Sequence, residues 1–156
     1  MPSSQYLTPH FSLTELTASQ TAARRGIDNT PSAEHRRNLK RLAHTLEEVR
    51  SLLGNRAVLV SSGYRGPALN TAIGGSRTSA HMSGLAADFT VPGFGTVFQV
   101  ARAIAASDIV YDQLIHEYGS WVHLGLAADG ATPRRQNLSI FTGTGYLNGI
   151  VGRPSA

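Results

Sequence analysis

The stretch YDQLIHEYGSWVHLGL, residues 111–126, has the pattern of a β-hairpin. Two apolar runs flank the segment YGS at 118–120, and a connection of this length is typical of antiparallel neighbours. Successive side chains of a strand point to opposite faces of the sheet. In the second run, Val122, Leu124 and Leu126 therefore share one face, which we expect to pack on the core. The other face of the hairpin is left for polar side chains.

The open face of the hairpin carries groups suited to chemistry. Trp121 and His123 lie on it in the second strand. With YGS as the turn, Glu117 pairs with Trp121, and in the same register Ile115 pairs with His123. Glu117 and His123 are then diagonal neighbours on one face, with backbone positions about 7–8 Å apart. Gln113 shares this face.

The same register separates two further polar residues from this face. Asp112 and His116 have the opposite parity, so we expect them to point away from it. A shift of one residue in the pairing would exchange the two sets. The assignment of faces therefore depends on the turn at YGS.

A second strand with an open face is indicated by SAHMSGLAADF, residues 79–89, and its continuation LAADFTV. The large apolar residues of this strand alternate with small or polar ones, which places Asp88 on the non-core face. Gly84 permits a tight turn between His81 and the strand. His81 and Asp88 can then reach one point from a single short segment.

His81, Asp88 and His123 together have the composition of a zinc site. The chain contains no cysteine, so a zinc ion must be bound by histidine and carboxylate groups alone. A catalytic zinc keeps three protein ligands and one open position, although this ligand set also admits other divalent ions. Glu117, close to the ion but not bound to it, is then the expected general base. The alternative is a capping histidine and an isolated polar residue at a strand end.

The remaining periodicity predicts an α+β domain, with helices first and then mostly strands. Ser12 and Glu15 form a capping-box pattern for a short helix that begins at about Leu13. The longest helix is expected to have Thr30 as its cap and to end at Gly54. The order is completed by a strand at AVLVSSGYR, a short helix at GPALNTAIGG, an amphipathic helix at TVFQVARAIAAS and a strand at LSIF.

Composition restricts the class of protein further. The chain has 156 residues, enough for one domain with a core, and no apolar run has the length that stable membrane insertion requires. Its start lacks the pattern of a secretory signal. The formal charge of +4, with the clusters ARRG, HRRNLKR and PRRQ, favours acidic partners or reflects solvated helix faces. Aromatic residues are not interleaved with these clusters, which argues against a nucleic-acid partner.

Much of the sequence resembles the zinc D-Ala-D-Ala carboxypeptidase family of murein peptidases, which includes short phage endolysins. The pattern S-x-H-x-x-G-x-A-x-D is complete from Ser79 to Asp88, and W-x-H is present as Trp121 and His123. The similarity covers about residues 10–127. It implies a hedgehog/DD-peptidase-like zinc peptidase fold, with a small, mostly antiparallel sheet packed on helices. It also implies zinc bound by the three residues identified above.

The resemblance further implies roles for residues around the metal. A catalytic acid is expected shortly before the last histidine. Some relatives place it three residues earlier, where this chain has Ser120, so Glu117 is the candidate. Arg65, in the segment GYR, is implied to stabilise the oxyanion or to hold a substrate carboxylate, unless it pairs with a surface carboxylate. The residues expected to contact substrate are Ser79, Gln113 and Trp121, the last of which alternatively serves as a packing wall.

We therefore expect a zinc-dependent peptidoglycan peptidase that cuts an amide bond in the murein stem peptide or cross-link, as a phage endolysin. Residues 1–156 are expected to form one domain, with 128–156 as a C-terminal extension and no separate wall-binding domain. The expected protein is a monomer, made in the bacterial cytoplasm without a signal peptide and active in the periplasm after release. The alternatives are a DD-carboxypeptidase that trims terminal D-Ala, an inactive metal-containing wall-binding module, and a basic nucleic-acid binder.

Overall fold

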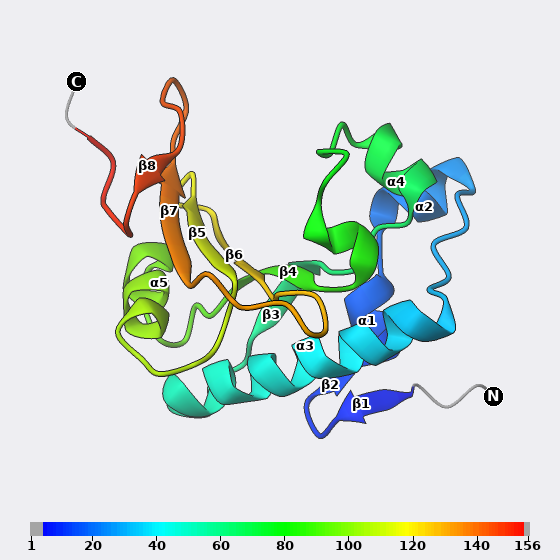
Figure 1. Ribbon diagram of the computed structural model, residues 1–156, viewed down its shortest axis with the longest axis horizontal. Helices are drawn as coiled ribbons and strands as arrows, with labels where there is room; N and C mark the ends of the chain where they lie inside the picture. Colours follow the sequence, from blue (N-terminus) through cyan, green and yellow to red (C-terminus); the bar gives the residue numbers. More distant parts are fainter. Residues whose placement is uncertain (1–4, 155–156) are drawn as a thin grey trace.

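A six-stranded sheet forms the centre of the computed structural model, which describes residues 5–154 (Figure 1). Its strand order is β3-β4-β6-β5-β7-β8. All neighbouring strands are antiparallel except β5 and β7, which run parallel. The strands are β3 (Leu59–Ser62), β4 (Ala86–Thr90), β5 (Gln113–Glu117), β6 (Trp121–Gly125), β7 (Gln136–Ile140) and β8 (Leu147–Asn148). The predicted α+β class with a mostly antiparallel sheet is confirmed.

The predicted hairpin is present in the expected register. Glu117 pairs with Trp121, and Ile115 pairs with His123 across β5 and β6. Val122 and Leu124 are fully buried on the core face, as their parity requires. The face that carries His123 is therefore the open one.

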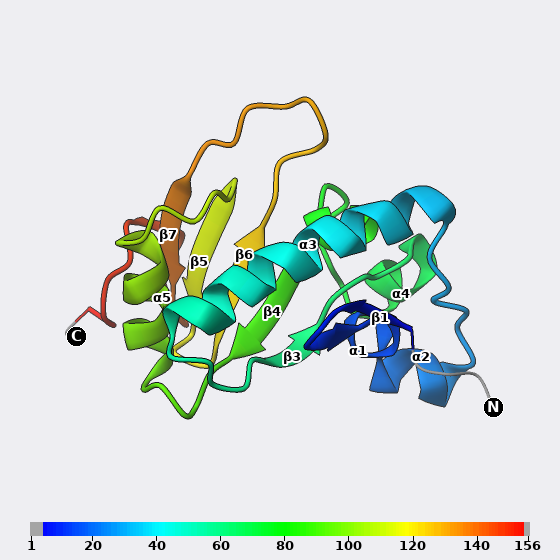
Figure 2. The same ribbon diagram turned by 90° about the horizontal axis from the view of Figure 1, so that it is seen from below.

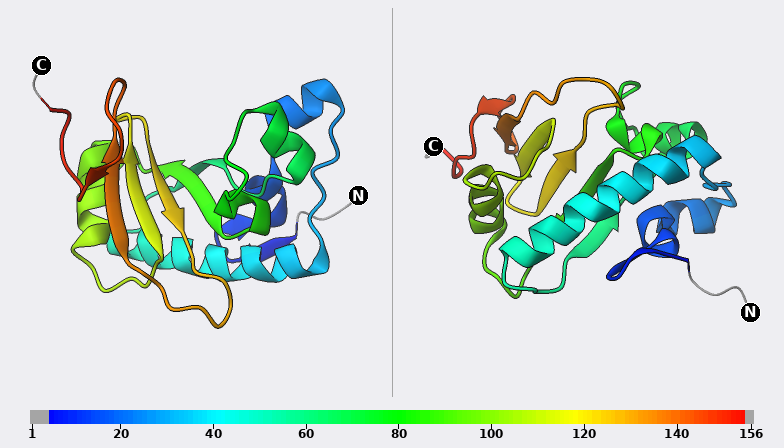
Figure 3. Two further views of the ribbon diagram at one scale, coloured as in Figure 1. Left: turned by 45° about the horizontal axis from the view of Figure 1, so that its top comes forward. Right: turned by 60° about the horizontal axis from the view of Figure 1, so that its bottom comes forward.

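Two helices cover the core face of the sheet (Figure 2). Helix α3 (Ala33–Leu52) crosses the strands, and α5 (Val97–Ala105) packs on β5 and β6. Their apolar faces meet the sheet in one cluster, and burial of this apolar area is the main stabilising contribution to the fold. The opposite face of β5 and β6 carries no helix within residues 5–154 (Figure 3).

The start of α3 differs from the prediction. Ser32, not Thr30, is its cap, and the Ser32 hydroxyl accepts a hydrogen bond of 3.1 Å from the backbone N–H of His35. The Thr30 hydroxyl and N–H instead both donate to the Asp28 carboxylate. Thr30 is therefore part of a local turn with Asp28. Because its hydroxyl is bonded there, it does not cap the helix, which begins later than expected.

The N-terminal elements pack beyond β3, next to one end of α3 (Figure 1). Helix α1 begins as predicted, because Ser12 and Glu15 form the capping box in both directions. The hairpin of β1 and β2, helix α2 and strand β8 were not predicted. The bounds of the N-terminal elements are β1 (Tyr6–Thr8), β2 (Phe11–Ser12), α1 (Leu13–Thr17) and α2 (Gln20–Arg25). The central loops contain α4 (Pro67–Ala72) and the 3-10 turn η1 (Ala80–Ser83).

The C-terminal extension continues the sheet. Strand β7 includes most of the predicted LSIF strand and pairs with β5, and β8 pairs with β7. Leu138 and Phe141 are buried there. No helix in the described part of the chain combines the length and the apolar character that crossing a bilayer requires.

Candidate metal centre and its cleft

Three potential metal ligands converge at one point on the open face of the sheet. His81 comes from η1, Asp88 from β4 and His123 from β6. Asp88 Oδ1 lies 2.9 Å from His123 Nδ1 and 3.3 Å from His81 Nε2. One ligand atom from each residue lies within 4.8 Å of the others, so a single ion can contact all three.

Strand pairing and a tight turn produce this convergence. Asp88 and His123 are direct partners across β4 and β6, so their side chains leave the sheet side by side. His81 reaches them because η1 is closed by Gly84, whose φ of 73° is in the left-handed region. A side-chain carbon at Gly84 would also lie 2.8 Å from the backbone oxygen of His35. The tight turn expected at Gly84 is confirmed.

The orientation of His81 leaves one ring nitrogen free for a metal. His81 Nδ1 lies 2.7 Å from the backbone oxygen of Gly63, at the end of β3. A carbonyl oxygen only accepts hydrogen bonds, so Nδ1 carries a proton, and Nε2, which is directed at Asp88, is the nitrogen that can bind a metal once it is deprotonated. Such an outer hydrogen bond is the usual way in which metal-binding histidines are oriented.

The charge state of Asp88 also suits a cation. Burial by itself would raise the pKa of Asp88, but its hydrogen bonds with His123 and His81 outweigh this effect and hold the pKa well below its usual range. The carboxylate is therefore ionised at neutral pH. Two imidazoles and one carboxylate, without sulfur, are a donor set that fits Zn²⁺ and related divalent ions.

Glu117 lies beside the group without belonging to it. Burial raises the pKa of Glu117, and the negative charge of Asp88 raises it further, while His123 and Arg65 act in the opposite direction. A carboxylate with a raised pKa is a stronger base than an ordinary one, which suits a group that accepts a proton and then returns it. Trp121, its cross-strand partner, lies 5.6 Å from the Tyr118 ring.

Arg65 is fixed next to the metal ligands. Its Nη2 donates to the Ser79 hydroxyl at 3.1 Å, and its backbone N–H donates to the oxygen of His81 at 3.0 Å. Burial lowers the pKa of Arg65, and the carboxylates of Asp88 and Glu117 oppose that effect. Arg65 forms no ion pair with a carboxylate in the described chain. The alternative in which it pairs with a surface carboxylate is therefore wrong.

One open cleft of about 780 Å³ contains all the residues that the sequence singled out. They are Arg65, Ser79, His81, Asp88, Gln113, Glu117, Trp121 and His123. The structure thus brings the complete set together in one cleft. His116, in contrast, is buried away from the cleft and packs against Phe98 and Phe141, as its parity predicts.

The cleft also contains residues that sequence reasoning missed. Asp112 was expected to point away, but it precedes the first residue of β5, so strand alternation does not govern it. It lines the cleft and accepts hydrogen bonds from the backbone N–H, Nε and Nη2 of Arg134, of which Nη2 to Oδ2 is 2.8 Å. Gln136, Tyr146 and Asn148, from the C-terminal extension, form the far wall. No local pattern marks them, because only the parallel pairing of β7 with β5 brings them there.

A mixed α+β fold with a His–Asp–His group, a half-buried carboxyl and a guanidinium in one open cleft defines a metal-dependent hydrolase. The family model described as Peptidase M15 matches residues 9–125, which is most of the chain. The chain belongs to this family, the zinc D-Ala-D-Ala carboxypeptidase family of murein peptidases. No curated protein matches it. Strands β7 and β8 lie outside the matched residues.

Proposed function

We propose that the protein is a zinc-dependent peptidoglycan peptidase that hydrolyses an amide bond of the stem peptide or cross-link. The observation that carries this proposal is the position of Glu117 and Arg65 in the same cleft as the His81–Asp88–His123 group. Membership of the peptidase M15 family supports a metallopeptidase that acts on peptidoglycan.

Each residue of the cleft has a role in this reaction. His81, Asp88 and His123 hold the zinc ion, whose chemistry when bound is Lewis-acid activation of a carbonyl and of water. Glu117 takes a proton from the attacking water and returns it to the leaving amine. Arg65 offers a fixed positive charge to the oxyanion that develops on the scissile carbonyl.

Three further residues of the cleft bind substrate or position a group that does. Ser79 holds the Arg65 guanidinium in place through its hydroxyl. Gln113 presents an amide on the face of β5 that lines the cleft, and it donates to Gln136 Oε1 at 2.9 Å. Trp121 forms a wall of the cleft beside Glu117.

We further propose that the protein acts as a phage endolysin and functions as a monomer. In this proposal the enzyme is made in the cytoplasm of the infected host cell. Its substrate lies in the periplasm, so it acts only after release. The pairing of β7 with β5 supports a single domain that includes the C-terminal extension. The resemblance of the sequence to short phage endolysins supports this role.

Digestion of purified peptidoglycan tests the proposal. Zinc-loaded protein is incubated with the polymer, the fragments are identified by mass, and chelator-treated protein is the control. New internal stem-peptide ends, together with clearing of permeabilised cells, are the expected result. Release of D-Ala without lysis would identify a DD-carboxypeptidase instead. Intact muropeptides in the presence of bound zinc would leave an inactive wall-binding module, the alternative that Ser120 keeps open.

A further inference from the structure

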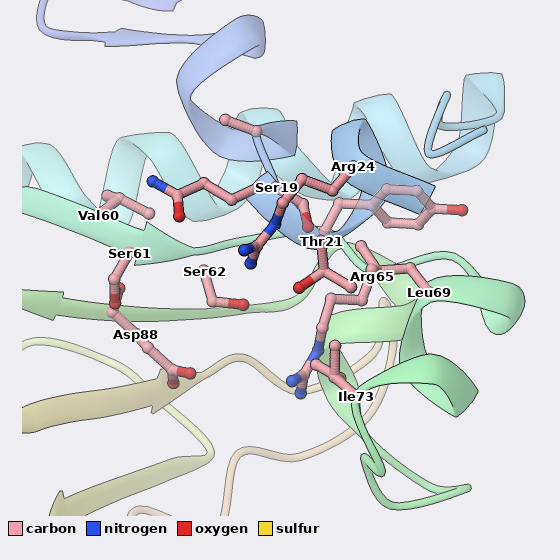
Figure 4. Close-up of a pocket in the computed structure, with 13 residues that line it drawn as sticks. Ser19, Thr21, Arg24, Val60, Ser61, Ser62, Arg65, Leu69, Ile73 and Asp88 are labelled. Atoms are coloured by element: carbon pink, nitrogen blue, oxygen red, sulfur yellow. The ribbon is translucent and has the colours of Figure 1, made fainter. Parts of the chain in front are cut away.

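A second cavity adjoins the metal cleft on the other side of Arg65 and Asp88. It measures about 640 Å³ and lies between α2, β3 and α4 (Figure 4). Arg65 and Asp88 line both cavities. A chain-like ligand can therefore pass from the cleft into this second cavity, which we call the Arg24 pocket.

The Arg24 pocket is positively charged. The guanidinium groups of Arg24 and Arg65 both extend into it (Figure 4). Arg24 is exposed and forms neither an ion pair nor a side-chain hydrogen bond within residues 5–154. The Nε of Arg65 is buried without a hydrogen-bond partner in the described chain. The one carboxylate in the wall, Asp88, already faces the two histidines.

The remaining lining defines the kind of group that fits beside this charge. Thr21 and Ser62 place hydroxyls in the pocket, whereas Leu69 and Ile73 form an aliphatic side contributed by α4 and its C-terminal cap. Guanidinium and hydroxyl donors bind carboxylates through charge-assisted hydrogen bonds. Aliphatic walls favour a short carbon chain over a large polar one. The pocket therefore suits a short aliphatic side chain that ends in a carboxylate.

We propose that the Arg24 pocket is a substrate subsite in which Arg24 binds a free carboxylate of the stem peptide, beyond the scissile bond. This inference rests on the proposed peptidase function. Stem peptides contain several carboxylates that do not take part in the reaction. A peptide that occupies both cavities places its amide bond between them, at the metal group. Arg24 then determines specificity and does not take part in the chemistry.

The test compares Arg24→Gln with Arg25→Gln. Arg25 is the next residue of α2 and is also exposed, but it does not line the pocket, so its variant controls for the lost charge. Two synthetic stem pentapeptides serve as probes, one with its free carboxylates and one with every non-terminal carboxyl group amidated. KM and kcat are measured with the zinc-loaded protein. Kd is measured by calorimetry in the Glu117→Gln background, which does not depend on turnover.

We expect Arg24→Gln to raise KM and Kd for the free-carboxylate peptide about three- to tenfold, as for a solvent-accessible charge-assisted contact. We expect Arg24→Gln to leave unchanged the KM and Kd for the amidated peptide, kcat and the zinc content. Arg25→Gln should leave all of these values unchanged for both peptides. Equal effects of the two variants, or no effect of either, would overturn the subsite. If the parent protein cuts nothing but Kd still depends on Arg24 and the carboxylate, the peptidase function fails and the subsite stands.

Discussion

At the scale of single residues, specific contacts orient the side chains of the His81–Asp88–His123 group. The Gly63 oxygen fixes the tautomer of His81, and cross-strand pairing places Asp88 against His123. His81 is only 2% exposed, and the side chains of Asp88 and His123 are 15% and 11% exposed. Such a group loses little conformational freedom when a metal binds, which favours high affinity.

Removal of a ligand is expected to abolish tight zinc binding. Asp88→Asn and His123→Ala should each lower zinc affinity at least about 100-fold. Loss of a residue that only hydrogen-bonds to a metal ligand already lowers metal affinity about 10- to 100-fold. Competition with a chromogenic chelator measures the affinity. His44→Ala is the control, because His44 is exposed on α3 and outside the group. Undiminished affinity in Asp88→Asn would exclude this residue as a ligand.

Replacement of Glu117 separates catalysis from binding. Glu117→Gln keeps the size and hydrogen-bonding capacity of the side chain but cannot transfer the proton. We expect kcat to fall about 10²- to 10⁴-fold, the usual contribution of a general base, with zinc content unchanged. Turnover assays on peptidoglycan fragments and metal analysis check this. A variant that retains full activity would move the role of base to another group.

The raised pKa of Glu117 also predicts an effect on stability. A carboxyl group whose pKa is higher in the folded than in the unfolded state stabilises the fold when protonated, and loses that contribution as pH rises through the folded-state pKa. In metal-free protein, Glu117→Gln should therefore have a higher Tm than the parent at pH 7. The difference should disappear below the ordinary Glu pKa of 4.5. Thermal unfolding at several pH values tests this, and an equal gain at all pH values would contradict it.

At the scale of elements, the loop after β3 connects the helical region to the metal group. Gly63 lies so close to α1 that an added Cβ would be 2.2 Å from the backbone oxygen of Leu16. Tyr64 N–H donates to that same oxygen at 2.7 Å. Asn29 bonds to the oxygens of Thr17 and Tyr64 and accepts from the N–H of Gly66. These contacts hold the segment that orients His81 and bears the Arg65 guanidinium.

Gly63→Ala tests this connection. The methyl group would meet backbone rather than a movable side chain, so the loop must shift away from α1. We expect the free energy of unfolding to fall by about 1–3 kcal/mol, as for overpacked sites. Zinc affinity should fall about 10- to 100-fold, because the partner of His81 Nδ1 moves. Gly152→Ala, at a site with no atom within 4 Å, is the control for both measurements. Normal zinc affinity in Gly63→Ala would show that His81 needs no such partner.

At the scale of the whole molecule, the cleft is built from two parts of the chain, one within the residues that the family model matches and one beyond them. The residues matched by the family model supply the metal group, Glu117 and Arg65. The extension beyond them supplies Tyr146 and its neighbours on the far wall. The Asp112–Arg134 contact and the Gln113–Gln136 hydrogen bond join the two parts. Differences in such an extension can therefore change substrate preference without altering the reaction.

Replacement of Tyr146 tests whether the C-terminal extension contributes to substrate binding. Its ring is 62% exposed although it lines the cleft, so it offers an unoccupied aromatic surface to substrate. Tyr146→Ala should raise KM for peptidoglycan fragments about two- to tenfold, the range of a single aromatic contact, with kcat, zinc content and Tm unchanged. Tyr6→Ala is the matched control, since Tyr6 is 64% exposed on β1, outside the cleft. An unchanged KM would show that the extension is structural only.

The sequence by itself determined the features that depend on near neighbours along the chain. Alternation in the hairpin predicted which face carries His123 and which residue pairs with Glu117, and both predictions are confirmed. Helical periodicity predicted α3 and α5, and the capping box predicted the start of α1. Interactions within a few residues select these structures, so they can be recognised without knowledge of the rest of the fold.

Only the tertiary structure decided how these elements meet. The pairing of Asp88 with His123 requires β4 to lie beside β6, and the partner of His81 requires β3 to end against α1. The far wall and the Arg24 pocket likewise join residues that are distant in sequence. Strand order and loop packing depend on burial of the whole core, and no local pattern encodes them. The donor groups of the candidate metal site could therefore be predicted from the sequence, whereas the shape of the cleft around them could not.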